Sequence, residues 1–125
     1  MNLARIRQEI AAAQRQFPTV ESHATSEGRP FVLAALQTTL GGVYTLEINF
    51  SDLYPNEMPS VYIRKPALAT SPHRYREGNI CFQHPSTWNP GLHDVKHVMA
   101  RAAKWLNKYE VWLQTRNWPG AEILH

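Results

Sequence analysis

An apolar stripe near the C-terminus sets the strongest limit on the fold. Its members follow one another at steps of three and four residues, the spacing of one face of an α-helix: Val95, Val98, Met99, Ala102, Trp105, Leu106, Tyr109, Trp112 and Leu113. Asp94 precedes the stripe, where an acidic side chain can cap a helix and complement its dipole. The sequence therefore predicts a long helix whose apolar face must be covered by another layer of structure.

The remaining periodic segments supply that layer. Apolar residues at helical spacing predict an N-terminal helix over residues 2–16, which Pro18 ends. Residues 31–39 and 43–50 are expected to be strands, the second because its apolar residues alternate with polar ones, and Gly41-Gly42 between them predicts a tight hairpin turn. Shorter segments, residues 19–24 and 61–64, are expected to be the first and fourth strands of the same meander.

Residues 66–92 show no periodicity and are rich in Pro, Gly, Ser, Asn and His. A connection of this length inside a compact domain is typical of a functional loop, and Cys81 lies within it. We therefore expect a single α+β domain over residues 1–125: an N-terminal helix, a four-stranded antiparallel meander, a long active-site loop and a C-terminal helix.

Composition limits the cellular setting and the partners. Hydrophobic residues make up 43% of the 125 residues, charged residues make up 18%, and the net charge is +3. No apolar run approaches the roughly 18 residues of a membrane span, and Arg5, Arg7 and Glu9 interrupt what would be a secretory signal. We expect a cytoplasmic protein without a membrane or nucleic-acid partner, because no nucleic-acid signature accompanies the scattered basic residues.

Cys81 is the only cysteine, so it cannot form an internal disulfide. A lone cysteine is more often a buried structural residue than a nucleophile. A zinc site formed by Cys81, His84, His93 and His97 is a second alternative, because their intervals suit a zinc ligand set. His97 is offset from the apolar stripe and is expected to point to solvent, so we predict neither a metal nor a cofactor.

Three segments carry a family resemblance. Residues 78–81, Gly-Asn-Ile-Cys, and the Trp-Asn-Pro of residues 88–90 resemble the catalytic core of ubiquitin-conjugating enzymes (UBC). "FSDLYPNEMP", residues 50–59, looks like the Tyr-Pro-x-x-x-Pro turn of that family. Ser71-Pro72-His73 stands where the family has His-Pro-Asn, and the short C-terminal segment resembles compact bacterial members associated with CBASS-type antiphage defence operons.

The resemblance implies a UBC-like core with a chemistry centred on Cys81. This thiol would accept the C-terminal acyl group of a protein as a thioester and pass it to a lysine amine. His73, at the asparagine position, is expected to donate to the oxyanion, act as a base or simply hold the loop. Supporting roles fall to Gly78, which allows the tight turn, Asn79, which would fix the approach to the thiol, His84, which borders the site, and Trp88, which packs the loop.

The resemblance also implies protein partners. The conjugated protein would be a cGAS-like nucleotidyltransferase or a ubiquitin-like modifier, and an activating enzyme would dock on Arg5 and Arg7 of the first helix, where a solvated face is the alternative. The basic residues of the last helix are expected to form a solvated face: Lys96, Arg101, Lys104 and Lys108. A different class of function remains open, a non-catalytic module that uses this fold to bind a protein.

Overall fold

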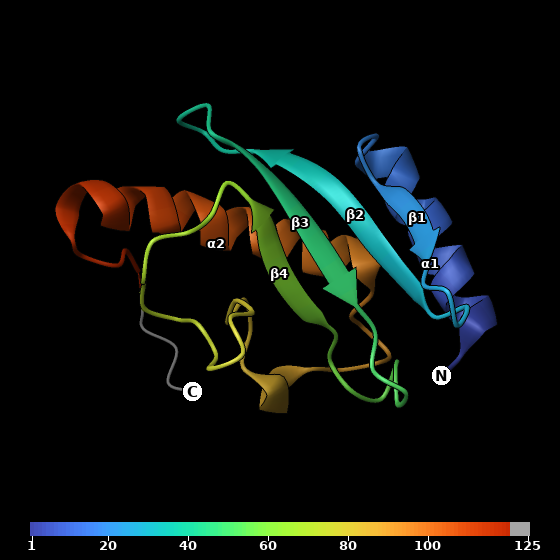
Figure 1. Ribbon diagram of the computed structural model, residues 1–125. Helices are drawn as coiled ribbons and strands as arrows, with labels where there is room; N and C mark the ends of the chain where they lie inside the picture. Colours follow the sequence, from blue (N-terminus) through green and yellow to red (C-terminus); the bar gives the residue numbers. More distant parts are fainter. Residues whose placement is uncertain (121–125) are drawn as a thin grey trace.

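The computed structural model of the chain describes residues 1–120 (Figure 1). Its elements follow the order α1 (Leu3–Gln16), β1 (Glu21–Ala24), β2 (Pro30–Gln37), β3 (Val43–Asn49), β4 (Ser60–Lys65), a short 3₁₀ helix η1 (Pro85–Thr87) and α2 (Val95–Thr115). The four strands pair antiparallel in the order β1-β2-β3-β4. The predicted α+β architecture, a meander between two helices, is confirmed.

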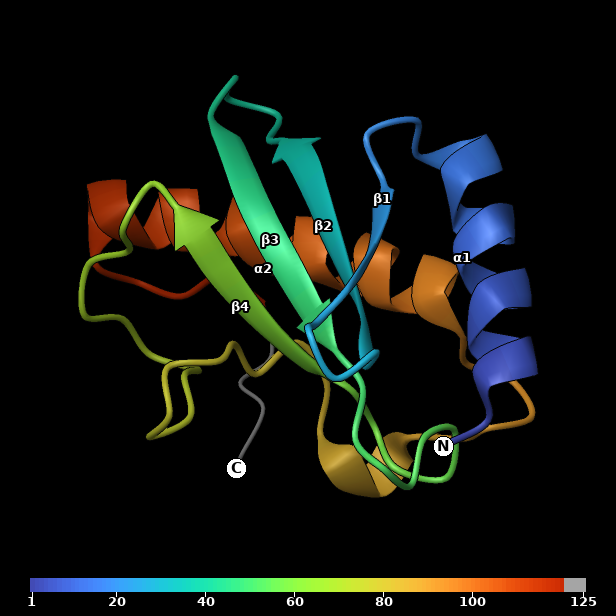
Figure 2. The same ribbon diagram turned by 45° about the vertical axis from the view of Figure 1, so that its right-hand side comes forward.

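The core lies between the sheet and its helices. α2 crosses one face of the sheet, and α1 lies along the β1 side and contacts the beginning of α2 (Figure 2). Strands β2 and β3 bury every second side chain in this layer. The alternating sequence predicts this for β3, whereas β2 is apolar on both faces. The hydrophobic residues that are completely shielded from solvent come from both layers and from the loop before α2: Ile6, Ala13, Val32, Leu46, Ile48, Val61, Ile80, Val95, Val98, Met99, Ala102 and Leu106.

Helix α2 begins where the sequence places it. The side chain of Asp94 accepts a hydrogen bond from the backbone N–H of His97 at 2.9 Å, which caps the helix. The stripe is buried through Tyr109, and Trp112 still packs on the core. Leu113 is 37% exposed, so the buried stripe ends before the last residue that the periodicity predicts.

The β2–β3 hairpin departs from its predicted bounds. β2 ends at Gln37 because Thr38 already belongs to the turn: its N–H donates to the Gly42 carbonyl at 2.8 Å, and its carbonyl accepts from Gly41 at 3.0 Å. Gly41 has φ +95°, which favours glycine. A Cβ on Gly42 would lie 2.2 Å from the Glu110 carboxylate, so this glycine allows a close approach to α2.

The loop before α2 contains more order than its sequence predicts. Arg74 and Ile80 form a β-bridge within a short hairpin, and the Ile80 N–H donates to the Val61 carbonyl of β4 at 2.9 Å. The loop is thereby fastened to the free edge of the sheet, beside the segment that carries Cys81. Within residues 1–120, no helix is long and apolar enough to cross a membrane.

Candidate active site

A short hairpin over residues 73–81 positions Cys81. The Cys81 N–H donates to the His73 carbonyl at 2.8 Å, and the Tyr75 N–H donates to the Asn79 carbonyl at 2.9 Å. Gly78 closes the turn by donating to the Tyr75 carbonyl at 2.9 Å, in a left-handed conformation with φ +96° that favours glycine. The hairpin thus fixes the backbone of Cys81 against His73.

The Cys81 thiol is almost fully buried, with 2% of the residue exposed. Burial raises its pKa to about 11, because a thiolate loses solvation there. A side-chain hydrogen bond from Tyr75 and the positive charge of Arg74 act in the opposite direction and lower that pKa. The resting thiol is therefore neutral near pH 7, with one hydroxyl and one cation placed to favour its anion.

Tyr75 is a site residue that the sequence analysis missed. Burial and the neighbouring Cys81 together raise the pKa of its phenol to about 12, so the hydroxyl remains a hydrogen-bond donor. Its place follows from the hairpin, in which the Tyr75 N–H is bonded to the Asn79 carbonyl. A tyrosine six residues before the cysteine, on the opposite arm of a turn that contains Gly78, is the sequence signal.

His73 holds Cys81 through its backbone. Its carbonyl accepts the Cys81 N–H at 2.8 Å and the Trp105 indole N–H at 3.2 Å. Its φ of +58° is uncommon for a residue with a side chain. The imidazole packs against Trp118, with 4.8 Å between ring centroids. The structure therefore brings His73 and Cys81 together, with the His73 carbonyl as the atom bonded to the Cys81 backbone.

A narrow cavity of about 40 Å³ adjoins the thiol. Basic side chains from α2 form one wall of it, and aromatic rings form much of the rest; its lining is His73, Cys81, Phe82, Arg101, Lys104, Trp105, Lys108 and Trp118. The prediction of a purely solvated basic face is wrong for Arg101 and Lys108, which are partly buried here. Arg101, Lys104 and Lys108 follow at steps of three and four, and that spacing is the signal for a shared wall.

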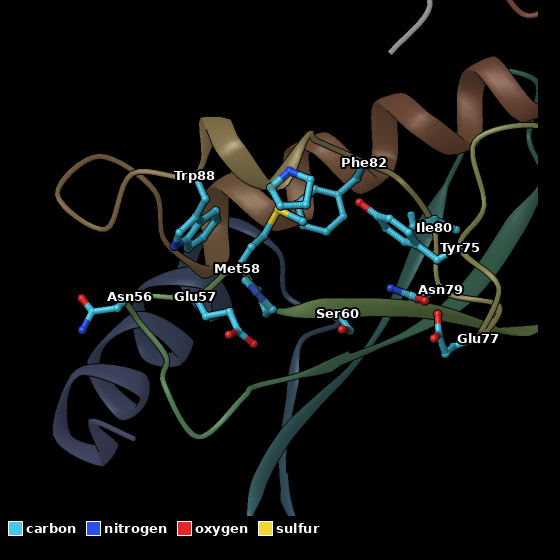
Figure 3. A pocket seen from close by; sticks show the side chains of 12 residues that line it. Asn56, Glu57, Met58, Ser60, Tyr75, Glu77, Asn79, Ile80, Phe82 and Trp88 are labelled. Carbon is cyan, nitrogen blue, oxygen red and sulfur yellow. The ribbon is translucent and has the colours of Figure 1, made fainter. Parts of the chain in front are cut away.

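A wider cavity of about 460 Å³ lies on the other side of the Cys81 segment (Figure 3). Figure 3 shows Trp88 and Asn56 at one end, Tyr75, Asn79 and Glu77 at the other, and Met58 and Phe82 between them. Asn79 therefore faces a different hollow from Cys81. Tyr75 and Phe82 separate the two hollows, because Tyr75 lines the wide cavity and bonds to the Cys81 thiol, while Phe82 lines both.

Trp88 supports one end of the wide cavity, whereas His84 lines neither the narrow nor the wide cavity. The indole N–H of Trp88 donates to the Pro55 carbonyl at 2.8 Å, and its ring lies 6.2 Å from that of Tyr54. This contact joins the segment after Cys81 to the β3–β4 loop. His84 caps η1, where its Nδ1 accepts from the Ser86 N–H at 3.1 Å.

Arg5 is engaged in holding the fold together. Its guanidinium pairs with the Glu9 carboxylate at 2.5 Å and donates to the carbonyls of Pro90 and His93. Buried Glu9 also accepts from the Tyr54 hydroxyl at 2.5 Å and the Val95 N–H at 3.0 Å. This cluster fastens α1 to the loop that leads into α2. Arg7, the second basic residue of the predicted docking surface, is exposed.

The histidines considered as zinc ligands make other contacts. The rings of His93 and His97 stack with centroids 4.0 Å apart, and the Gln83 side-chain oxygen lies 2.5 Å from His97 Nε2. Burial and the nearby His93 and Arg101 lower the pKa of His97, which keeps its ring neutral. In the part of the chain that the structure describes, no three His, Cys, Asp or Glu side chains are grouped as a metal ion requires.

Solved structures share this fold. The Vps23 UEV, solved in a complex with ubiquitin, covers 84% of the chain at a TM-score of 0.60, with 18% identity and 83% of its own chain matched. The yeast Vps23 UEV domain, solved with a Vps27 PSDP peptide, covers 98% of the chain at 0.61, with 14% identity and 86% of its own chain matched. Human ubiquitin-conjugating enzyme E2 G1 covers 81% at 0.56, with 19% identity and 90% of its own chain matched.

Sequence comparison indicates the same group of proteins. Two Arabidopsis thaliana proteins, whose names describe them as ubiquitin-conjugating enzymes E2 39 and E2 38, are 30% and 33% identical to the chain over 73 residues. That match spans 58% of the chain and 20% of each plant protein. The model of a family described as "Type II CBASS E2 protein" matches residues 9–125. Since this match extends over nearly the whole chain, including the hairpin that carries Cys81, the chain belongs to the Type II CBASS E2 family.

Proposed function

We propose that the chain carries the C-terminus of a protein as a thioester on Cys81 and transfers it to a lysine amine. The observation that carries this proposal is the placement of Cys81: its backbone is fixed to the His73 carbonyl, the residue lines the narrow cavity, and its thiol is hydrogen-bonded to the Tyr75 hydroxyl. Membership of an E2 family supports the general class of reaction.

The two steps follow from thiol chemistry. The Cys81 thiolate attacks the carbonyl carbon of an activated C-terminus, the bond to the activating group breaks, and that group leaves with its electron pair. An amine then attacks the thioester carbon, loses a proton, and expels the Cys81 thiolate as an amide forms. Tyr75 and Arg74 support both steps, because each favours the thiolate over the buried thiol.

His73 is the proposed positioning residue of this site. Its carbonyl fixes Cys81 and bonds to Trp105, which links the nucleophile to the middle of α2. Of the three roles that the family resemblance implies for His73, oxyanion donor, base and loop-holding residue, these contacts favour the last, because they are made by the backbone of His73. A variant with asparagine at position 73 tests the side chain separately.

The proposed setting is antiphage defence in the bacterial cytoplasm. The family match supports a CBASS context, and a cGAS-like nucleotidyltransferase encoded nearby is the proposed protein to be conjugated, with a ubiquitin-like modifier as the alternative. The activating enzyme, where one takes part, would approach the surface near exposed Arg7 of α1.

A non-catalytic protein-binding module is the second candidate. The burial of Cys81 to 2% exposure favours it, because a shielded thiol must be uncovered before it meets an acyl group. The wide cavity beside β4 would then be the principal binding surface.

One experiment separates the two candidates. The chain is expressed with its neighbouring genes as wild type, Cys81→Ser, Cys81→Lys and Cys81→Ala, and each protein is analysed by intact mass. Catalysis predicts a thiol-sensitive adduct on the wild type, a thiol-resistant ester on Cys81→Ser, a stable amide on Cys81→Lys, and none on Cys81→Ala. The absence of adducts from all four, with the wild type folded, would overturn the catalytic proposal.

A further inference from the structure

Three cations of α2 line the same narrow cavity as Cys81: Arg101, Lys104 and Lys108. They lie three and four residues apart, so one side of the helix presents all three. Lys104 is exposed, whereas Arg101 and Lys108 are partly buried. We call these three residues the cationic strip.

In the part of the chain that the structure describes, no residue of the cationic strip forms an ion pair. Within residues 1–120, each of the four ion pairs involves other residues, from Arg5, His23, Arg29 and Arg64. Burial and the positive charges of Lys104 and Arg101 together lower the pKa of Lys108, so the cations repel one another. A negative ligand would relieve this repulsion, and partial burial would make the attraction stronger than it is between fully exposed charges.

Arg101 connects the cationic strip to the backbone beside Cys81. Its Nε donates to the carbonyl of Phe82, the residue after Cys81, at 3.3 Å. The remaining guanidinium N–H groups of an arginine so anchored are suited to a carboxylate. The cationic strip is therefore bonded to the backbone next to Cys81, where the acyl group of the conjugated protein would bind.

We propose that the cationic strip docks an acidic peptide, the segment immediately before the C-terminus that Cys81 receives. This inference rests on the proposed function and specifies which kind of protein C-terminus Cys81 would receive. Residues 101 to 108 of a helix span about 10 Å, which an extended peptide covers in three or four residues. The acidic side chains therefore belong in the last few residues before the reacting carbonyl. A peptide fits better than a nucleic acid, because the strip ends at a buried thiol and aromatic rings.

The test uses two synthetic peptide thioesters as probes. Both have the same length and end in Gly-Gly; one carries four Asp or Glu residues before the glycines, and the other carries Ser and Asn instead. Exchange with Cys81 forms the peptide thioester on the protein and releases the small thiol, which intact mass follows. We expect the acidic probe to react at least tenfold faster at 50 mM salt, with the advantage falling steeply by 300 mM.

Matched variants separate charge from other causes. Lys104→Glu/Lys108→Glu should remove the advantage of the acidic probe, whereas Lys104→Arg/Lys108→Arg should keep it, since it retains charge without the amines. Arg15→Glu, an exposed charge reversal on α1, should change the rate less than twofold. Equal rates for both probes, or loss in the arginine variant, would overturn the proposal while leaving thioester formation intact.

Binding measurements keep the inference testable without catalysis. Fluorescence anisotropy of the labelled acidic peptide, as a free acid, should give a dissociation constant at least tenfold lower than that of the neutral peptide. A single-stranded oligonucleotide of equal charge serves as competitor. Tighter binding of the oligonucleotide than of the acidic peptide at the strip would contradict the proposal and indicate a nucleic-acid ligand instead.

Discussion

The two hollows beside the Cys81 segment differ in size and in charge. The cavity that includes Cys81 measures about 40 Å³ and has a wall of three cations. The cavity on the other side measures about 460 Å³ and includes the carboxylates of Glu57 and Glu77 (Figure 3). The larger hollow is therefore not the one that contains the proposed nucleophile.

This difference has a physical origin in how each hollow is built. The wide cavity lies between the β3–β4 loop and the segment after Cys81, which the Trp88–Pro55 hydrogen bond joins at one end. The narrow cavity lies against α2, where Trp105 is packed into the core. Loop residues therefore form most of the wall of the wide cavity, whereas a helix that packs into the core forms one wall of the narrow cavity.

Of the tests that compare the two cavities, the pH dependence of Cys81 alkylation should show the largest effect. With a pKa of about 11, the thiolate fraction rises about tenfold per pH unit below that value. The iodoacetamide reaction, followed by mass, should therefore accelerate about a thousandfold between pH 7 and pH 10. An ordinary thiol with a pKa near 8.5 gains only about thirtyfold over the same range, because it is almost fully ionised by pH 10.

The unfolded chain in denaturant provides the control for this titration. Its Cys81 should behave as the ordinary thiol, so the two curves should differ in shape as well as in height. If the alkylation rate of the folded protein levelled off by pH 9, the narrow cavity would not raise the pKa of the Cys81 thiol. The two cavities would then not differ in how they shield the nucleophile.

A second prediction compares the two tryptophan braces. Trp105 is 4% exposed and belongs to the core, so Trp105→Ala should lower the free energy of unfolding by about 3–5 kcal/mol. Trp88 is only partly buried, and Trp88→Ala should cost about 1–3 kcal/mol. Urea denaturation of both variants measures the difference.

Trp105→Phe isolates the bond to the His73 carbonyl. It keeps an aromatic ring but removes the indole N–H, and should cost about 1 kcal/mol beyond the change in packing. An equal or greater loss in Trp88→Ala than in Trp105→Ala would show that the wide cavity, rather than the narrow one, is the more rigidly supported.

The sequence predicts the fold well because periodicity reports the burial of each face. The alternation in β3 and the stripe of α2 both locate core residues, and Asp94 marks the start of α2 within one residue. β2 ends two residues early because the Thr38 backbone bonds within the turn, a local competition that side-chain alternation does not reveal.

The site was only partly predictable for a related reason. A motif locates Cys81 and Gly78 in the chain, but it does not say which way neighbouring side chains face on the hairpin. Asn79 therefore lines the wide cavity, and Tyr75, absent from the motif, contacts the thiol. Helical periodicity predicts that the cations of α2 face solvent, because it separates apolar from polar residues without showing which loop residues the polar face contacts.

The smallest predicted effect tests whether Tyr75 is the link between the two hollows. Its hydroxyl bond lowers the pKa of Cys81, so Tyr75→Phe should raise that pKa and leave less thiolate at any pH below it. A hydrogen bond of about 1 kcal/mol corresponds to alkylation roughly threefold to tenfold slower at pH 8. The rate ratio of the two proteins under identical conditions measures this.

Glu77→Gln is the matched variant on the wide side. Glu77 is exposed and does not act on the Cys81 thiol, so its loss should change the alkylation rate less than twofold. Alkylation more than twofold faster in Glu77→Gln than in the wild type would mean that the carboxylate of the wide cavity raises the pKa of the Cys81 thiol electrostatically. The two hollows would then act as one site, because charge in the wide cavity would set the ionisation of the thiol in the narrow one.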